Sequence, residues 1–201
     1  MIFRKAELRD LDQIVDIHML AFPDFFLTSL GKSFLKQYYK VYIKYSHIAL
    51  VAEDNEVIEG FVVGSNNSVI FYENLKKEFI FFIYPTLLNA INLKLLSKIF
   101  KRLFSVLFKK KVNRALKTYT GLNELTSIGV NPKGQSRGLG RKLLIEYEQQ
   151  CRAYKVKGIT LTTDAENNDG VLTFYKKSGY EIDQTFIQDE KRVMYSLVKY
   201  F

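Results

Sequence analysis

A glycine-rich, basic turn lies between residues 130 and 144, where the sequence reads VNPKGQSRGLGRKLL. It holds three glycines and four Lys or Arg residues, after a β-rich run and before a run with helical spacing. The first amides of a helix have no partner within the helix, and the helix dipole adds partial positive charge there. The pattern therefore predicts a binding site for a diphosphate. Taken alone, a glycine-bearing turn before a helix is also common in loops that have no binding function.

The spacing of the glycines excludes two common nucleotide motifs. It is neither the six-residue dinucleotide fingerprint nor the GxxxxGK[ST] phosphate loop, so it implies neither a nicotinamide nor a magnesium nucleotide. A second segment downstream, NDGVLTFYKKSGYE, reads as a short helix that ends at Gly179.

These two segments together resemble the signature of the GNAT superfamily, the acetyl-CoA-dependent N-acetyltransferases. The turn matches the family pattern Q/R-x-x-G-x-G/A, and the second segment matches N-x-x-A-x-x-F-Y-x-x-x-G-F. The matching positions are Gln135, Gly138, Gly140, Asn168, Phe174, Tyr175 and Gly179. Val171 and Tyr180 stand where the family usually has Ala and Phe.

The resemblance implies how acetyl-CoA, the co-substrate, is held. The strand before the turn is expected to diverge from the next strand, GITLTTD, and the thioester arm is expected to lie in the gap. Backbone groups on the first strand would bind the arm and polarise the acetyl carbonyl, and the turn amides would hold the diphosphate. The implied cofactor-binding residues are Ile128, Gly129, Val130, Gln135, Ser136, Arg137, Gly138, Leu139, Gly140, Arg141 and Asn168.

The reaction needs an acid for the leaving thiolate and a base for the attacking amine. The resemblance gives Tyr175 the role of general acid, although it also fits a core aromatic beside its neighbour. Glu124 is the best-placed general base, acting directly or through a water, and it also fits a solvated strand end. Asp164 and Glu166 are weaker candidates, and Thr163 stands where some family members carry a glutamate base.

The composition indicates an ordinary globular domain. The chain has 201 residues, 47% of them apolar and 25% charged, which suits a single domain over residues 1–201. Cys151 is the one cysteine, so no intrachain disulfide forms, and no metal site is expected from it with His18 and His47. Both histidines are expected to be structural. The charged N-terminus lacks a signal-peptide core, so a cytoplasmic location is expected.

The net charge of +9 comes from one region. Residues 91–120 hold nine Lys or Arg residues and no acidic ones, so the rest of the chain is balanced and general nucleic-acid binding is not expected. Residues 93–111 repeat apolar pairs four residues apart with basic residues between them, which predicts an amphipathic, cationic helix within an insertion at about 66–121. The insertion could serve as a lid, a homodimer surface or a peripheral membrane contact.

The order of elements predicts a mixed α/β (α+β) domain. Strands are expected at 2–5, 47–54, 57–65, 122–130, 158–164, 180–186 and 192–200, and helices at 10–22, 27–42, 140–155 and 170–178. By the resemblance, the sheet is GNAT-like and mostly antiparallel, with a splayed strand pair, helices on both faces and a helical insertion between the third and fourth strands.

The acceptor is expected to enter opposite acetyl-CoA, over the first two helices. Phe22, Phe25 and Phe26, with Asp24 nearby, could form an apolar wall for an amine, or could be helix–helix core. The predicted function is N-acetylation of a small-molecule amine, such as an amino sugar or its nucleotide- or lipid-linked form. The alternatives are a non-catalytic acyl-CoA sensor or scaffold, and a protein (N-terminal or lysine) acetyltransferase.

Overall fold

The computed structural model describes residues 1–45, 48–66, 70–71, 73–78, 119–134, 138–188 and 192–201. Within them, seven strands form one sheet in the order β1-β2-β3-β4-β5-β7-β6, in which β4 and β5 are parallel and all other neighbours are antiparallel. The strands are β1 (Ile2–Lys5), β2 (Ile48–Asp54), β3 (Val57–Ser65), β4 (Leu122–Val130), β5 (Gly158–Asp164), β6 (Glu181–Gln188) and β7 (Arg192–Tyr200). The predicted fold class is confirmed.

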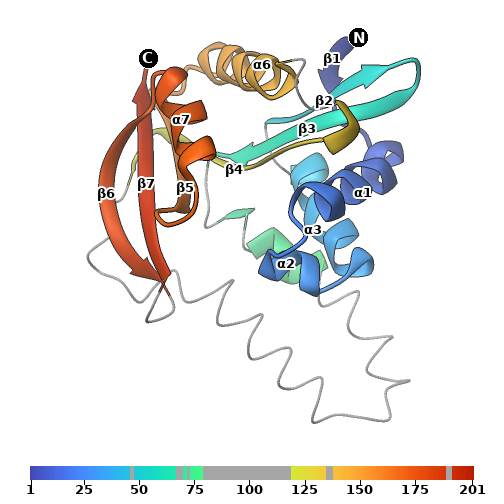
Figure 1. Cartoon of the computed structure of the whole chain (residues 1–201). Coiled ribbons are helices and arrows are strands. Elements are labelled where there is room, and N and C mark those ends of the chain that lie inside the picture. The colour runs from blue at the N-terminus through green and yellow to red at the C-terminus, as the bar shows by residue number, and fades with distance from the viewer. Residues whose placement is uncertain (46–47, 67–69, 72, 79–118, 135–137, 189–191) are drawn as a thin grey trace.

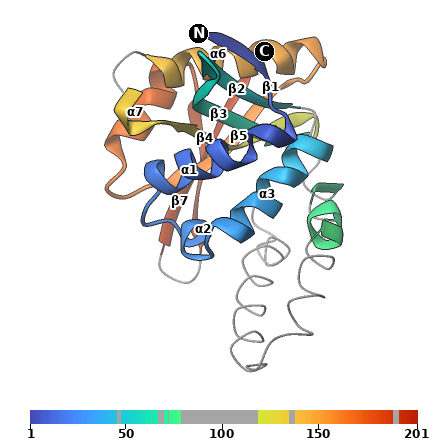
Figure 2. The ribbon, with the colours of Figure 1, turned by 90° about the vertical axis from the view of Figure 1, so that its right-hand side faces the viewer.

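Helices cover both faces of this sheet, as Figures 1 and 2 show. The helices are α1 (Leu11–Ala21), α2 (Phe26–Ser29), α3 (Lys32–Tyr45), α6 (Leu139–Ala153) and α7 (Asp169–Lys177), with short 3-10 turns η1 (Leu8–Asp10) and η3 (Pro132–Gly134). One apolar core lies between the sheet and α1 with α3, and a second lies between the sheet and α6 with α7.

Strand β2 shows why its sequence is almost continuously apolar. Ala49 and Val51 belong to the core under α1 and α3, whereas Ile48, Leu50 and Ala52 belong to the core under α6. Side chains alternate between the faces of a strand, so a strand covered on both faces needs apolar residues at every position.

The predicted helix over 27–42 is in fact two helices, α2 and α3. Gly31 separates them with a φ of +85°, a left-handed conformation that glycine adopts without steric cost. The apolar spacing continues through this break, at Leu27, Leu30, Phe34 and Leu35, so periodicity alone does not reveal it.

A close contact sets α6 against the sheet. Tyr147 on α6 is fully buried and donates a hydrogen bond to Asn123 at the start of β4. Any Cβ on Gly64 of β3 would overlap the Tyr147 hydroxyl, so glycine is required where the ring crosses the sheet. This contact fixes the helix whose first turn faces the candidate site.

Most of the predicted insertion, including the basic helix at 93–111, lies outside the described residues. Its described helical residues are 70–71 and 73–78, and Glu78 ties them to α3 by pairing with Lys40 and Lys44 at 3.0 Å each. The three alternatives for the insertion at about 66–121, a lid, a homodimer surface or a membrane contact through 93–111, therefore stay predictions. Among the helices the structure describes, none has the length and apolar character needed to cross a membrane.

Candidate active site

Strands β4 and β5 separate soon after they begin. They pair in parallel only at Leu122 with Gly158, Asn123 with Ile159, and Glu124 with Thr160. Beyond these pairs β4 continues beside β3 as far as Val130, and β5 continues beside β7 as far as Asp164. The predicted divergence of the two strands is confirmed, and it opens the sheet at its centre.

A β-bulge on β4 lies at the point of separation. Val63 pairs with Ser127 and Gly64 pairs with Leu125, which leaves Thr126 without a partner in the β3–β4 ladder. An extra residue of this kind bends a strand and redirects its side chains. Ser127 consequently faces α3, where its hydroxyl lies 3.3 Å from that of Tyr39.

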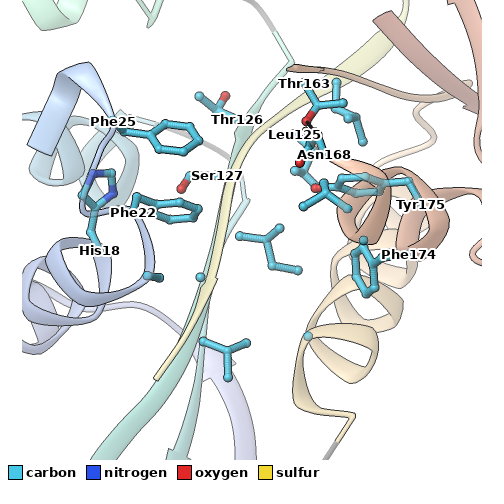
Figure 3. A pocket seen from close by; sticks show the side chains of 18 of the residues that line it. His18, Phe22, Phe25, Leu125, Thr126, Ser127, Thr163, Asn168, Phe174 and Tyr175 are labelled. Carbon is cyan, nitrogen blue, oxygen red and sulfur yellow. Dashed lines mark hydrogen bonds between the residues drawn. The ribbon is translucent and has the colours of Figure 1, made fainter. Parts of the chain in front are cut away.

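A cavity of about 740 Å³ extends through the opened sheet. Figure 3 shows its two sides, with His18, Phe22 and Phe25 on one side of β4 and Asn168, Phe174 and Tyr175 on the other. The lining residues are His18, Ala21, Phe22, Phe25, Leu27, Tyr38, residues 125–130, 138–141 and 161–164, Asn168, Gly170, Val171, Phe174 and Tyr175. Two ligands can thus meet in one space from opposite faces.

The first turn of α6 supplies the anion-binding features predicted from the sequence. Gly138 precedes the helix with a φ of +65°, and no side chain of the described residues caps the helix start. Four residues of this turn, 138–141, line the cavity, and the exposed Arg141 adds positive charge. Unpaired amides and a cation at a helix start suit a diphosphate. Gln135, Ser136 and Arg137 lie outside the described residues.

The predicted backbone site on β4 also lines the cavity. Ile128, Gly129 and Val130 all contact it. A Cβ on Gly129 would lie 2.7 Å from Phe61 and 3.3 Å from Phe22, which leaves no room for a side chain. Glycine here therefore lets both rings pack directly against the strand, beside the backbone expected to hold the thioester arm.

Tyr175 lies on the opposite side of the gap, on α7. Its side chain is 5% exposed and lines the cavity, and its ring packs edge-on against Phe174 and Tyr180 at centroid distances of 5.0 and 5.5 Å. Burial raises the pKa of Tyr175 well above the usual value for a phenol. The hydroxyl therefore keeps its proton at neutral pH, as a general acid must.

Asn168 connects the end of β5 to the start of α7. Its Nδ2 donates hydrogen bonds to Thr163 Oγ1 at 2.7 Å and to the Asp164 carbonyl at 2.9 Å. These bonds fix the orientation of the amide, and the residue lines the cavity. The side-chain oxygen is thereby the group left to meet a ligand.

Glu124, the predicted general base, does not line the cavity. It precedes the bulge, at the last β4 position that pairs with β5. Asp164 does line the cavity, but its carboxylate is held by Arg192 through two contacts of 2.5 Å. The described part of the chain holds no group of three His, Cys, Asp or Glu residues that could bind a metal.

Of the residues predicted to form a wall for the acceptor, some line the cavity and some do not. Phe22 and Phe25 line the cavity, with ring centroids 5.1 Å apart, whereas Phe26 and Asp24 do not. His18 also lines it, and its Nδ1 lies 2.6 Å from the Tyr39 hydroxyl. Sequence reasoning missed Tyr39, Ser127 and Arg192, because no local pattern distinguishes them from ordinary core or surface residues.

The burial of His18 predicts a pH-dependent stability. Burial lowers its pKa from 6.5 to about 4, so the folded protein holds the ring neutral where the unfolded chain would protonate it. This contribution is complete above pH 6.5 and is lost as the pH falls through that value toward 4. From about pH 7 to about pH 4, wild-type protein should lose about 3 kcal/mol more unfolding free energy than His18→Gln in urea titrations. Parallel losses in the two proteins would contradict this account.

Comparison with known proteins adds a sequence match over the site. Residues 100–180 match the model of the acetyltransferase (GNAT) family. A segment of 53 residues is 38% identical to the uncharacterized protein YxbD of Bacillus subtilis (strain 168). This segment is 26% of the chain and spans only 33% of the length of that relative.

Solved structures share the fold over nearly the full chain. Ribosomal-protein-alanine N-acetyltransferase from Brucella melitensis has a TM-score of 0.64 at 17% identity, with 100% of both chains covered. Aminoglycoside 6'-acetyltransferase type Ii has a TM-score of 0.63 at 16% identity, with 100% of this chain and 97% of the other covered.

A third structure contains a ligand. The PaiA N-acetyltransferase from Thermoplasma acidophilum, in complex with coenzyme A, has a TM-score of 0.59 at 14% identity and covers 100% of this chain and 98% of its own. At these identities the likeness shows the fold, whereas the family match includes both the glycine-rich turn and α7. Residues 100–180 thus match the acetyltransferase (GNAT) family model, and the chain as a whole shares its fold with solved acetyltransferases.

Proposed function

We propose that the protein transfers an acetyl group from acetyl-CoA to the primary amine of a small molecule, by direct attack in a ternary complex. The cavity carries this proposal, because it joins the first turn of α6 to the aromatic residues of α1 and its following loop through the gap between β4 and β5. Two bound reactants held side by side in one cavity react as if at very high concentration.

The residues on the α6 and α7 side fit the co-substrate. The amides at 138–141 and the Arg141 guanidinium bind the diphosphate, and the backbone of Ile128 and Val130 orients the thioester arm. A backbone amide that polarises the acetyl carbonyl stabilises developing negative charge by about 3 kcal/mol. Asn168 binds the arm through its free oxygen, and Tyr175 donates a hydrogen bond to the departing sulfur.

The residues on the α1 side suit an amine with an apolar body. Phe22, Phe25, Leu27 and Tyr38 supply apolar surface. Among the described lining residues the one carboxylate is Asp164, which Arg192 neutralises. A polycation needs several carboxylates to replace its hydration, so a monoamine fits better. An amino sugar that presents an apolar ring face, free or lipid-linked, meets this description.

The experiment measures free thiol released from acetyl-CoA with a panel of amines: glucosamine, 2-phenylethylamine, spermidine and a peptide with a free N-terminal alanine. Release with either monoamine, and less with spermidine, supports the proposal. Thermal stabilisation by coenzyme A without thiol release on any amine indicates a binding module instead. Release confined to the peptide indicates a protein acetyltransferase.

A further inference from the structure

His18 is a buried polar side chain whose hydrogen bonding is incomplete. The residue is 3% exposed and lines the cavity from α1. Its Nδ1 is engaged by Tyr39, while Nε2 has no hydrogen-bond partner among the described residues. Figure 3 places the ring beside Phe22 on the α1 side of β4. Buried polar atoms in folded proteins nearly always have a partner, so an open position beside a cavity points to a ligand.

The other ring nitrogen of His18, Nδ1, is linked to the cavity by the hydroxyl groups of Tyr39 and Ser127. His18 Nδ1 lies 2.6 Å from the Tyr39 hydroxyl, which lies 3.3 Å from Ser127 Oγ. Tyr39 is fully buried, whereas Ser127 lines the cavity. The imidazole and the two hydroxyls therefore form a chain whose two end residues, His18 and Ser127, both line the cavity, and they come from α1, α3 and β4.

This chain has two neutral proton arrangements. In the first, Nδ1–H donates to Tyr39, Tyr39 donates to Ser127, and Nε2 carries a lone pair. In the second, Ser127 donates to Tyr39, Tyr39 donates to Nδ1, and Nε2 carries the hydrogen. Hydroxyls and neutral imidazole serve equally as donors and acceptors, so both arrangements satisfy the buried groups. One proton transferred along the chain converts the first arrangement into the second.

We propose that His18 accepts the proton of the attacking amine at Nε2, and that Tyr39 and Ser127 carry a proton onward to water in the cavity. The inference rests on the proposed acetyl transfer. The amine N–H bond breaks and an Nε2–H bond forms. The Nδ1 proton passes to Tyr39, the Tyr39 proton to Ser127, and the Ser127 proton to water. The thiolate separately gains its proton, so the overall reaction only moves one proton from nitrogen to sulfur.

A neutral relay fits the environment of His18 better than an isolated base does. Burial lowers the pKa of the imidazole to about 4, which disfavours an imidazolium, and no carboxylate contacts the ring among the described residues. A relay avoids that charge because the second proton leaves as the first arrives. Glu124, in contrast, lies outside the cavity lining.

An amine reaches Nε2 only after a local movement exposes this atom, and we expect Phe22 to make that movement. The Phe22 ring lies 5.0 Å from the imidazole, and Nε2 itself is not accessible to solvent. Phe22 follows the last residue of α1, where the backbone has left the helical conformation. Catalytic hydrogen bonds often form only when substrate is bound, and the end of a helix is a place where a side chain can shift.

The first test measures thiol release from acetyl-CoA with 2-phenylethylamine as the probe. His18→Gln is expected to lower kcat by roughly 10²-fold, with an unchanged affinity for coenzyme A. Tyr39→Phe and Ser127→Ala are expected to lower kcat without changing KM for acetyl-CoA, and Ser127→Thr, which keeps a hydroxyl, should lose less than Ser127→Ala. A kcat equal to that of wild-type protein in His18→Gln, or a smaller loss there than in Glu124→Gln, overturns the relay.

The second test reads the proton positions without turnover. The protein is labelled with 15N-histidine. The imidazole signals that disappear in His18→Gln belong to His18, and those that remain belong to His47. Nitrogen spectra should show His18 Nε2 unprotonated, and its signal should move when 2-phenylethylamine is added with coenzyme A. A proton on Nε2 in the free protein overturns the relay and leaves acetyl transfer intact. An unprotonated Nε2 without thiol release on any amine supports the relay geometry and contradicts the proposed function.

Discussion

Gly138→Val is expected to weaken the binding of coenzyme A strongly in calorimetric titrations. Gly138 precedes α6 with a φ of +65°, a conformation in which a β-branched residue is a severe outlier. Holding such a residue there costs about 1–3 kcal/mol, and relieving the strain reorients the first amides of α6. The upper end of that range corresponds to roughly a hundredfold weaker binding.

Gly31→Val is the matched control for this variant. Gly31 also has a positive φ, +85°, and an added Cβ meets no atom within 4 Å at either glycine. The backbone penalty is therefore similar, but Gly31 lies between α2 and α3 and does not line the cavity. Gly31→Val should lower the unfolding temperature and keep coenzyme A binding. Equal loss of binding in both variants would mean that general destabilisation, and not the α6 turn, is responsible.

The sequence predicts the elements of this site better than it predicts their contacts. Strands β4 and β5 begin and end as expected, because apolar, β-branched runs are bounded there by glycine, proline or aspartate. The glycine-rich turn at residues 130–144 is also recognisable from the sequence, because its glycines lie close together in the chain. The break at Gly31 is not legible, because the apolar spacing on its two sides is continuous.

Contacts between residues that are far apart in the chain cannot be predicted from local sequence patterns. His18 and Tyr39 are 21 residues apart, and Tyr39 and Ser127 are 88 apart, so no local pattern connects them. The bulge at Thr126 determines which residue faces α3, and nothing in LNELTSIGV marks its position. From the sequence, His18 is expected to be structural, and that expectation stays untested. Among the described residues Nε2 has no partner, which no local pattern could foretell.

The two sides of the cavity, the α6 side and the α1 side, suit ligands of different chemistry. The α6 side presents amides and a cation, whereas the α1 side presents aromatic rings and a neutral imidazole. We therefore expect an anionic co-substrate to be stabilised on one side only, and an apolar amine on the other. Productive binding in the reverse orientation would place a diphosphate against Phe22 and Phe25, where its lost hydration is not replaced.

Tyr175→Phe is expected to slow acetyl transfer roughly 10²-fold while leaving coenzyme A affinity unchanged. The ring would keep its edge-on contacts with Phe174 and Tyr180, so only the hydroxyl is lost. Burial raises the pKa of this phenol further above that of an alkyl thiol, which is about 8.5. We therefore expect Tyr175 to stabilise the departing thiolate mainly by donating a hydrogen bond, which places the expected loss at the lower end for general acids.

Tyr180→Phe gives the comparison that isolates this role. Tyr180 is buried like Tyr175, and its ring centroid lies 5.5 Å away, but it does not line the cavity. Removal of its hydroxyl should leave single-turnover rates of thiol release close to those of wild-type protein. If both variants slow release equally, the effect belongs to the packing of α7 and not to a proton donor. If only Tyr175→Phe does so, the donor is the hydroxyl that faces the gap between β4 and β5.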